Sequence, residues 1–407
     1  MNKVFGLLGR HLGHSYSPYI HNHLGEYEYN LFEVEPDQLD EFMVKREFSG
    51  INITIPYKQD VMKYCDTISE KAIKIGAVNT IVNKNGKLFG DNTDYNGFLY
   101  QLQFGNIDVH GKKVLILGTG GASKAVFAVL QDQNARDIVF ISRTGENNYD
   151  NLHQHMDCEV IVNTTPVGMY PNNGLAPLNI RPFEKLEAVV DLIYNPTYTE
   201  IVLSAKDAGK KYASGLSMLV EQARVASELF QDVKISSKKT ELITKQLQNN
   251  MKNIILVGMP GCGKSSIAEE LSKRLNRPLV DLDNEIVKNI KMSIPEFFSK
   301  NSESQFRKIE SDVLKEFSKE SGLVIATGGG IVTVIDNHHL LQQHSQVIFI
   351  KRNMENLPKT GRPLSLKTDL SIMYKERKPL YEKISEFEIQ NDDINIAVDE
   401  IIEKLSL

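Results

Sequence analysis

Two segments of this sequence each join an apolar run to a glycine-rich turn and then to a helical pattern. They are KKVLILGTGGASKAVFAVL, residues 112–130, and KNIILVGMPGCGKSSIAEELSKRL, residues 252–275. An apolar run that leads through glycines into a helical period is typical of a buried parallel strand followed by a helix. The two openings start about 140 residues apart, so we predict two nucleotide-binding α/β units.

Length and charge narrow the classes of protein to consider. At about 100–200 residues per domain, 407 residues predict two to four domains. A net charge of -5 argues against non-specific nucleic-acid binding, which needs a field that attracts phosphate. No stretch approaches the roughly 20 apolar residues of a membrane span, and the apolar run near the N-terminus is too short for a signal peptide. We expect neither nucleic acid nor membrane as a partner.

The three cysteines are Cys65, Cys158 and Cys262. Their wide spacing suits neither a metal site nor a disulfide framework. A chain without a disulfide framework is typical of a reducing compartment, so we expect a cytoplasmic location.

The polar stretch at residues 236–253 lies ahead of the second opening. We interpret its first part as the end of a helix and QNNMKN as a junction, with the domain boundary near 248–252. Upstream, NTIVNKNGKLFGDNTD predicts a hairpin with its turn at Asn85-Gly86. The apolar-periodic residues 218–231 predict a helix that packs back on the first domain.

The first glycine turn, GTGGAS at residues 118–123, has the form of a pyrophosphate site. Gly118 permits a tight turn, while Gly120 and Gly121 let the backbone approach a pyrophosphate at a helix N-terminus. By itself the same pattern also fits an ordinary strand-to-helix turn. The next strand ends at Ser142-Arg143-Thr144, where an NAD site would carry an acid. Arg143 favours the 2′-phosphate of NADP, although a solvent-facing arginine is the simpler alternative.

Eight motifs in order give the first about 245 residues a resemblance to shikimate dehydrogenase. They are HSYSPYIHN (14–22), GINITIPYK (50–58), GAVNT (76–80), GDNTDYNG (90–97), GTGGAS, NTTPVGM (163–169), DLIYNP (191–196) and GLSMLVEQ (215–222). The resemblance implies a Rossmann-like NADP-binding domain at about 98–214, flanked by substrate-binding segments 1–97 and 215–247.

The resemblance also assigns roles to single residues. Lys58 and Asp94 would be the catalytic pair, since an ammonium beside a carboxylate can protonate and stabilise the alkoxide formed by hydride transfer. The substrate-binding set would include that pair with Ser15, Ser17, Thr54, Asn79, Tyr194 and Gln222. The cofactor set would be Gly118, Thr119, Gly120, Gly121, Ala122, Ser142, Arg143, Thr144, Gly215 and Met218.

Two positions depart from the pattern of that family. Ser217 stands where the family usually has Gly, which would alter how the nicotinamide amide is seated. Asn147 stands where many relatives have Lys or Arg, which weakens the expected NADP preference while Arg143 remains.

The second opening contains GMPGCGKS, residues 258–265, which fits the phosphate-binding loop G-x-x-x-x-G-K-[ST]. Lys264 would reach the β- and γ-phosphates, and Ser265 would bind Mg²⁺. The expected ATP-binding residues here are Gly261, Cys262, Gly263, Lys264, Ser265 and Ser266.

Residues 252–407 resemble shikimate kinase through VDLDNEI (280–286), FRKIE (306–310), ATGGG (326–330), GRPL (361–364) and ERKPLY (376–381). We expect Asp281 and Asp283 on one strand edge, with both carboxylates pointing the same way. The resemblance puts Asp281 near Mg²⁺ and makes Asp283 the base. The shikimate-binding residues would be Asp283, Arg307, Gly328, Gly329, Gly330 and Arg377.

The lid of this second domain is shorter than in the family that it resembles. Strand VIFI ends at Ile350, and the lid arginine, Arg362, follows closely. Arg362 would stabilise charge on the transferring phosphoryl group. Lys359 is expected in the place of an adenine-stacking arginine, and we expect altered ATP affinity or lid closure.

The predicted fold is α/β, with a substrate domain and a Rossmann-like NADP domain in residues 1–247. A P-loop kinase domain with a five-stranded parallel sheet follows in residues 252–407. The predicted function is NADPH-dependent reduction of 3-dehydroshikimate, followed by phosphorylation of shikimate by ATP with Mg²⁺. The alternatives are a quinate dehydrogenase, a kinase for another small acceptor, and a sensor that binds these ligands without turnover.

Overall fold

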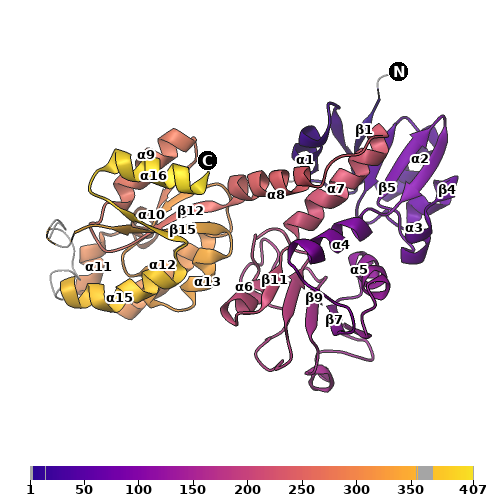
Figure 1. The fold of residues 1–407 in the computed structure, drawn as a ribbon. Helices are drawn as coiled ribbons and strands as arrows, with labels where there is room; N and C mark the ends of the chain where they lie inside the picture. The colour runs from indigo at the N-terminus through magenta and orange to yellow at the C-terminus, as the bar shows by residue number, and fades with distance from the viewer. Residues whose placement is uncertain (1–2, 14, 354, 356–369, 407) are drawn as a thin grey trace. The chain divides into compact units, whose positions relative to one another are not determined.

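The computed structural model describes residues 3–13, 15–353, 355 and 370–406. The chain forms two compact units (Figure 1). Unit 1 contains Met1–Met169, Leu175–Tyr194 and Ile201–Gln246, and unit 2 contains Tyr170–Gly174, Asn195–Glu200 and Leu247–Leu407. The division near residue 246 falls inside helix α8 (Lys238–Met251). The first four residues of the expected junction QNNMKN are therefore helical, and its last residue, Asn253, begins a strand. Neither Gly nor Pro interrupts the sequence there.

Unit 1 begins with a mixed six-stranded sheet in the order β2-β1-β3-β5-β6-β4. Its strands are β1 (Phe5–Gly9), β2 (Tyr29–Glu33), β3 (Gly50–Ile53), β4 (Thr67–Ile68), β5 (Thr80–Lys84) and β6 (Lys87–Asp91). The helices among them are α1 (Ser17–Leu24), η1 (Pro36–Gln38), α2 (Leu39–Lys45), η2 (Asp60–Tyr64) and α3 (Glu70–Ile75). Strands β5 and β6 form the predicted hairpin, and Asn85 and Gly86 at its turn both have positive φ.

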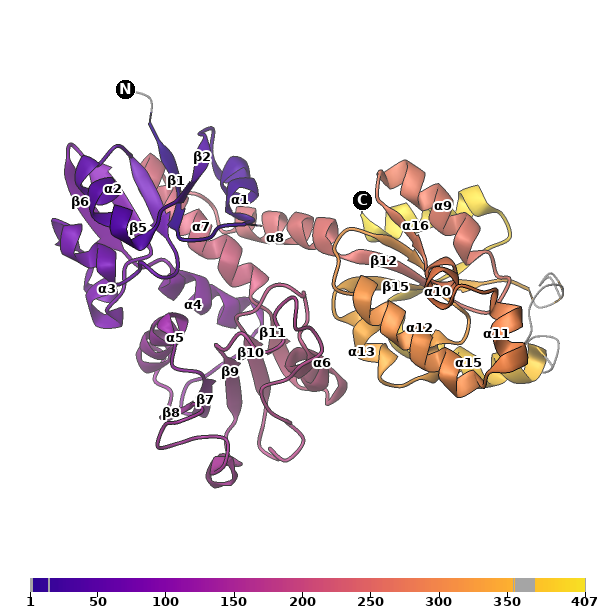
Figure 2. The same ribbon diagram turned by 180° about the vertical axis from the view of Figure 1, so that it is seen from behind.

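The second sheet of unit 1 is parallel throughout, in the order β11-β10-β9-β7-β8 (Figure 2). Its strands are β7 (Lys113–Leu117), β8 (Asp137–Ile141), β9 (Val160–Asn163), β10 (Ala188–Asp191) and β11 (Lys211–Ala213). The helices in this part are α5 (Gly121–Asp132), η3 (Leu152–His155) and α6 (Glu200–Asp207). This is the Rossmann-like sheet that the first glycine turn predicts.

Helices α4 (Asp94–Phe104) and α7 (Leu216–Gln231) pack against each other between these two sheets. They approach so closely that a Cβ on Gly97 would lie 2.7 Å from the carbonyl oxygen of Met218. Further along α7, the ring of Phe230 stacks on Phe5 of β1 at 5.1 Å. The predicted helix at 218–231 therefore exists and packs back on the first sheet.

Unit 2 contains the predicted five-stranded parallel sheet, in the order β13-β14-β12-β15-β16. Its strands are β12 (Asn253–Val257), β13 (Leu279–Asp281), β14 (Val324–Ala326), β15 (Ser345–Lys351) and β16 (Phe387–Gln390). Its helices are α9 (Lys264–Leu275), α10 (Leu282–Ile290), α11 (Ile294–Lys300), α12 (Glu303–Phe317), η4 (Ile331–Thr333), α13 (Asn337–Gln342), α15 (Leu370–Ile384) and α16 (Ile394–Leu405).

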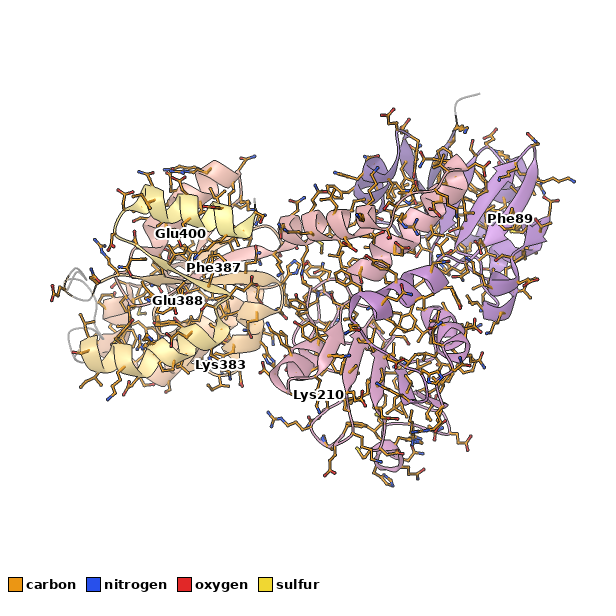
Figure 3. The ribbon with its side chains drawn as sticks, in the orientation of Figure 1. Phe89, Lys210, Lys383, Phe387, Glu388 and Glu400 are labelled. Atoms are coloured by element: carbon orange, nitrogen blue, oxygen red, sulfur yellow. The ribbon has the colours of Figure 1, made fainter. Side chains whose placement is uncertain are left out.

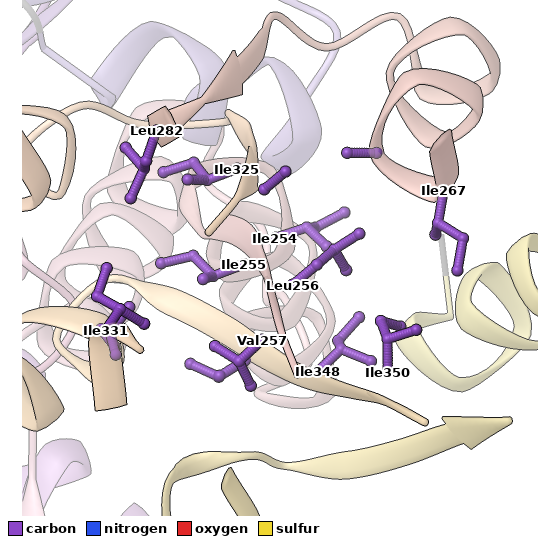
Figure 4. Close-up of a cluster of buried hydrophobic side chains, with 14 of the residues drawn as sticks. Ile254, Ile255, Leu256, Val257, Ile267, Leu282, Ile325, Ile331, Ile348 and Ile350 are labelled. Atoms are coloured by element: carbon purple, nitrogen blue, oxygen red, sulfur yellow. The ribbon is translucent and has the colours of Figure 1, made fainter. Parts of the chain in front are cut away.

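The central strand β12 is buried along its whole length. Ile254, Leu256 and Val257 lie among apolar side chains of the neighbouring strands, including Ile325 and Ile348 (Figure 4). Glu388 lies on the edge strand β16 (Figure 3). Its carboxylate lies 2.7 Å from the ammonium of Lys351 on β15. Because the strands are covered on both faces, the sheet holds the loops at their carboxyl ends in fixed positions.

None of the helices in the described part of the chain has the length and hydropathy that a membrane-spanning segment needs.

Candidate active sites

Lys58 and Asp94 form an ion pair in unit 1. Nζ of Lys58 lies 2.6 Å from Oδ2 of Asp94, and the two side chains are 23% and 14% exposed. Lys58 follows β3, and its carbonyl accepts a hydrogen bond from the backbone N–H of Val78. Asp94 opens α4, and its N–H donates to Oδ1 of Asn92. Backbone hydrogen bonds on both sides therefore fix the predicted catalytic pair.

Asn79 and Gln222 lie beside this pair, on either side of Thr93. Asn79 is buried, and its amide nitrogen donates to Oγ1 of Thr93 at 3.1 Å. Oγ1 of Thr93 lies 3.5 Å from Oε1 of Gln222, a residue of α7. Because Thr93 directly precedes Asp94, the structure brings these two predicted substrate residues close to the ion pair.

The remaining predicted substrate residues come from three further segments. Oγ of Ser15 accepts a hydrogen bond from the N–H of Ser17 at 3.2 Å. Between them, the ring of Tyr16 meets that of Tyr194 edge to face at 6.1 Å. Burial raises the pKa of Tyr194, and the nearby Tyr16 adds to the rise. Thr54 follows β3 and donates its backbone N–H to Leu8.

A cavity of about 760 Å³ opens at the carboxyl end of the parallel sheet in unit 1. The predicted cofactor residues that line it are Gly118, Thr119, Gly120, Ser142, Arg143 and Thr144. Gly118 has φ +98°, and a Cβ there would lie 3.0 Å from Thr164 and Thr165, so the turn needs glycine. The residues fit a nucleotide, since backbone N–H groups at a helix N-terminus meet an exposed arginine.

The other predicted cofactor residues lie next to this cavity or farther along the chain. Gly121 and Ala122 form the first turn of α5. Gly215 and Met218 lie at the start of α7, where Ser217 is buried and its hydroxyl has no hydrogen-bond partner among the described residues.

Three polar residues that line the cofactor cavity were missed by the sequence interpretation: Tyr149, Thr164 and Thr165. The two threonines lie in the quoted NTTPVGM motif, which could have identified them. Tyr149 and Arg143 line the same cavity. Burial raises the pKa of Tyr149, and the charge of Arg143 opposes that rise. Asn147 forms a hydrogen bond with His155, with its Oδ1 lying 3.0 Å from Nε2 of the histidine.

The phosphate-binding loop in unit 2 connects β12 to α9. The ammonium of Lys264 is buried and donates to the carbonyl oxygens of Gly258 and Met259 at 2.9 and 3.0 Å. Oγ of Ser265 donates to Oδ2 of Asp281 at 2.7 Å. Two oxygen ligands side by side fit Mg²⁺, which binds few protein groups and takes its other ligands from water and phosphate. Across the described residues, no cluster of three or more His, Cys, Asp or Glu side chains suits a metal.

A cavity of about 670 Å³ extends from this loop. Its lining contains all the predicted shikimate-binding residues, namely Asp283, Arg307, Gly328, Gly329, Gly330 and Arg377. A Cβ on Gly330 would lie 2.1 Å from a guanidinium nitrogen of Arg307, so any side chain there would displace that guanidinium. Arg377 donates to the carbonyl oxygen of Gly329 at 3.0 Å.

Glu310 also lines this cavity, and the sequence interpretation did not assign it a role. Its carboxylate is fully buried and lies 2.7 Å from Arg307, whose other terminal nitrogen contacts Glu303. Burial raises the pKa of Glu310, against the opposing charge of Arg307. Burial would lower the pKa of Arg307, but Glu310 and Glu303 outweigh it and raise that pKa.

The expected strand alternation of Asp281 and Asp283 is wrong. Strand β13 ends at Asp281, whose side chain caps α10 by accepting from the N–H of Asn284. Asp283 therefore lies in the first turn of that helix rather than on the strand. Asp281 contacts the phosphate-loop serine, while Asp283 lines the cavity, so the two carboxylates lie in different surroundings.

Lys359 and Arg362, with the lid to which they were assigned, lie outside the described residues.

Known proteins match both parts of the chain. The family model "Shikimate dehydrogenase substrate binding domain" matches residues 7–81, and the family model "Shikimate kinase" matches residues 260–406. Shikimate dehydrogenase (NADP(+)) of Clostridium perfringens is 38% identical over 267 residues, which is 60% of this chain and 98% of that protein.

Solved structures resemble the same N-terminal part. A chorismate mutase/shikimate 5-dehydrogenase fusion protein from Clostridium acetobutylicum is 39% identical, with a TM-score of 0.59 over 61% of this chain and 97% of that one. The shikimate 5-dehydrogenase of Thermus thermophilus, in complex with NADP(H) and shikimate, is 30% identical, with a TM-score of 0.55 over 60% and 99%.

The chain therefore belongs to the shikimate dehydrogenase family, and with the shikimate kinase domain that follows in residues 260–406 it is a bifunctional enzyme of the shikimate pathway.

Proposed function

We propose that unit 1 reduces 3-dehydroshikimate with NADPH and that unit 2 phosphorylates the resulting shikimate with ATP and Mg²⁺. The observation that carries the first activity is the Lys58–Asp94 ion pair of 2.6 Å, with the Asn79 and Gln222 amides beside it. The second activity is supported by a cavity that joins a phosphate-binding loop to two buried arginines.

In the first reaction, NADPH supplies the hydride that reduces the ketone carbon. The ammonium of Lys58 donates a proton to the oxygen that becomes the hydroxyl, and Asp94 holds that ammonium in place. The serines, Thr54, the two amides and Tyr194 provide hydrogen-bond partners for the ring hydroxyls and the carboxylate. Fixing the substrate in this way holds its ketone close to Lys58.

The choice of NADPH over NADH rests on Arg143. A guanidinium makes charge-assisted hydrogen bonds to a phosphate, whereas a ribose hydroxyl offers it no charge. Gly118, Thr119 and Gly120 would hold the pyrophosphate at the N-terminus of α5. Gly215 and Met218 remain our proposal for the nicotinamide end.

In the second reaction, Ser265 and Asp281 would hold Mg²⁺, which neutralises charge on the phosphates. Lys264 leaves the carbonyls of its own loop and contacts the β- and γ-phosphates. Asp283 accepts the proton of the acceptor hydroxyl, while Arg307 and Arg377 bind the carboxylate of the ring. Arg362 and Lys359, outside the described residues, keep their proposed roles at the phosphoryl group and the adenine.

We place the two enzymes at residues 1–247 and 252–407 and expect a cytoplasmic location. NADPH and ATP, which the two reactions consume, are supplied there. The partners are then small molecules, 3-dehydroshikimate and shikimate, without nucleic acid or membrane.

Mass spectrometry of the products tests both activities together. The purified chain is incubated with 3-dehydroshikimate, NADPH, ATP and Mg²⁺, and we expect shikimate 3-phosphate. Shikimate without its phosphate would contradict the kinase assignment. Absence of any product would contradict both assignments and favour a sensor that binds without turnover.

A further inference from the structure

A buried chain of hydrogen bonds starts at Tyr29, a residue to which no role was assigned above, and leads to Asn79. The hydroxyl of Tyr29 donates to Oδ1 of Asn52 at 2.7 Å, and both residues are buried. The ring of Tyr29 lies parallel to that of His21, with centroids 3.9 Å apart, and this stacking fixes its position.

The orientation of the Asn52 amide is determined by its neighbours. Its Nδ2 lies 3.4 Å from the backbone carbonyl of Asn79 and 3.0 Å from Oγ1 of Thr80. A carbonyl oxygen can only accept a hydrogen bond, so the nitrogen must be on that side. Oδ1 of Asn52 therefore faces Tyr29, and the tyrosine hydroxyl must be the donor.

The direction of donation continues to the proposed substrate residues. Thr80 receives a hydrogen bond from Asn52 and donates its own proton to Oδ1 of Asn79 at 3.0 Å, which is closer than its other neighbour, Oγ1 of Thr93 at 3.3 Å. Nδ2 of Asn79 then donates to Thr93, and Thr93 faces Oε1 of Gln222. Oδ1 of Asn79 also accepts the backbone N–H of Thr93 at 2.7 Å, so Thr80 and Thr93 together orient this amide. One N–H of the Asn79 amide is then left without a partner among the described residues.

We propose that Tyr29 is a positioning residue for substrate binding in the dehydrogenase, acting through Asn52 and Thr80 on the amide of Asn79. This inference rests on the proposed function of unit 1. The unused N–H of Asn79 is the group that donates a hydrogen bond to the substrate. Without the Tyr29 hydroxyl, the buried Oδ1 of Asn52 loses the donor that lies 2.7 Å from it, and rotation of that amide would redirect Thr80 away from Asn79.

The test compares Tyr29→Phe with the unaltered full-length chain. The variant keeps the ring that stacks on His21 and removes only the donor. We expect the KM for 3-dehydroshikimate to rise about 2- to 10-fold, the range for one neutral hydrogen bond. The kcat and the KM for NADPH should each change less than about twofold, because a positioning defect acts on substrate binding alone.

Tyr27→Phe is the matched control. Its hydroxyl lies in the same aromatic cluster and is bonded to Ser227 and His21, but not to Asn52. We expect this variant to keep the KM of the unaltered chain. An equal rise in both variants would show a general packing defect and overturn the inference.

A double-mutant cycle tests the route through Asn52. In an Asn52→Ala background, Tyr29→Phe should cause no further rise in KM, because the acceptor is already gone. Additive effects, or an unchanged KM in Tyr29→Phe alone, would overturn this inference while the proposed function stands. Failure of the unaltered chain to reduce 3-dehydroshikimate would overturn the proposed function, and this inference with it.

Discussion

Nζ of Lys58 and Oδ2 of Asp94 lie 2.6 Å apart, although 36 residues separate them in the sequence. The pair connects the loop after β3 of the first sheet to the start of α4, the helix that packs on α7. Gln222 of α7 lies close to Thr93, so a single packing arrangement holds catalytic and substrate-binding groups together.

Removing either member of this pair should stop reduction. We expect Lys58→Met and Asp94→Asn to lower kcat for 3-dehydroshikimate by about 10²- to 10⁴-fold, because proton delivery and charge stabilisation are lost. Shikimate phosphorylation by the same chain serves as the control and should stay within about twofold. A Lys58→Met variant with more than a tenth of the normal rate would contradict the role of that lysine.

Arg143 should determine the preference for NADPH. Arg143→Ala is expected to raise the KM for NADPH about 10- to 100-fold, the range for a lost charge-assisted hydrogen bond, and to leave the KM for NADH nearly unchanged. Arg136→Ala is the matched control, since Arg136 is exposed at 59% and pairs with Glu159. Equal losses with both cofactors in Arg143→Ala would be evidence against a contact to the 2′-phosphate.

Gly330 should be required for acceptor binding in the kinase. In Gly330→Ala, the new Cβ would lie 2.1 Å from a guanidinium nitrogen of Arg307 and displace that side chain. We expect the KM for shikimate to rise about 10- to 100-fold, because a charged contact to the carboxylate is lost. The KM for ATP and the dehydrogenase rate should remain close to normal. An unchanged KM for shikimate would show that Arg307 does not bind the carboxylate.

The buried His21 should make unit 1 sensitive to acid. Complete burial lowers the pKa of His21 to about 3, against a smaller opposing effect of the Asn52 side chain. The folded protein therefore holds this ring neutral, while the unfolded chain protonates it near pH 6.5. The contribution of His21 to the free energy of unfolding is fully present above that pH and is lost as the pH drops towards 3. The loss between pH 7 and pH 5 is about 2 kcal/mol.

Hydrogen exchange of peptides from β1 to β3, measured at pH 7 and pH 5, would check this prediction. In His21→Phe the loss between the two pH values should be smaller by about 2 kcal/mol. His23→Phe, at an exposed position of the same helix, is the control and should keep the loss of the unaltered chain. A loss of equal size in His21→Phe would assign the acid sensitivity to other groups.

Features that depend on neighbouring residues in the sequence were predictable. An apolar run, a glycine turn and a helical period identified β7 with α5 and β12 with α9. The turn was predicted from the pair Asn85-Gly86, because few other residue pairs adopt two positive φ values easily. Both residues have positive φ in the structure. The prediction failed at Asp283, which was assigned to a strand although it lies two residues after the strand ends, in the first turn of a helix. The side chain of Asp281 caps a helix there, and the alternating pattern does not distinguish these two outcomes.

Local backbone preferences and short motifs were enough to predict two nucleotide-binding sheets, their order along the chain and the residue types that each reaction needs. Only the tertiary structure decided that Glu310 contacts Arg307 inside the acceptor cavity, that Tyr149 lines the cofactor cavity, and that Tyr29 donates to Asn52. A buried polar group must find its partner wherever packing places one, and Asn52 finds Tyr29 on a neighbouring segment, 23 residues away. No local pattern records that partnership.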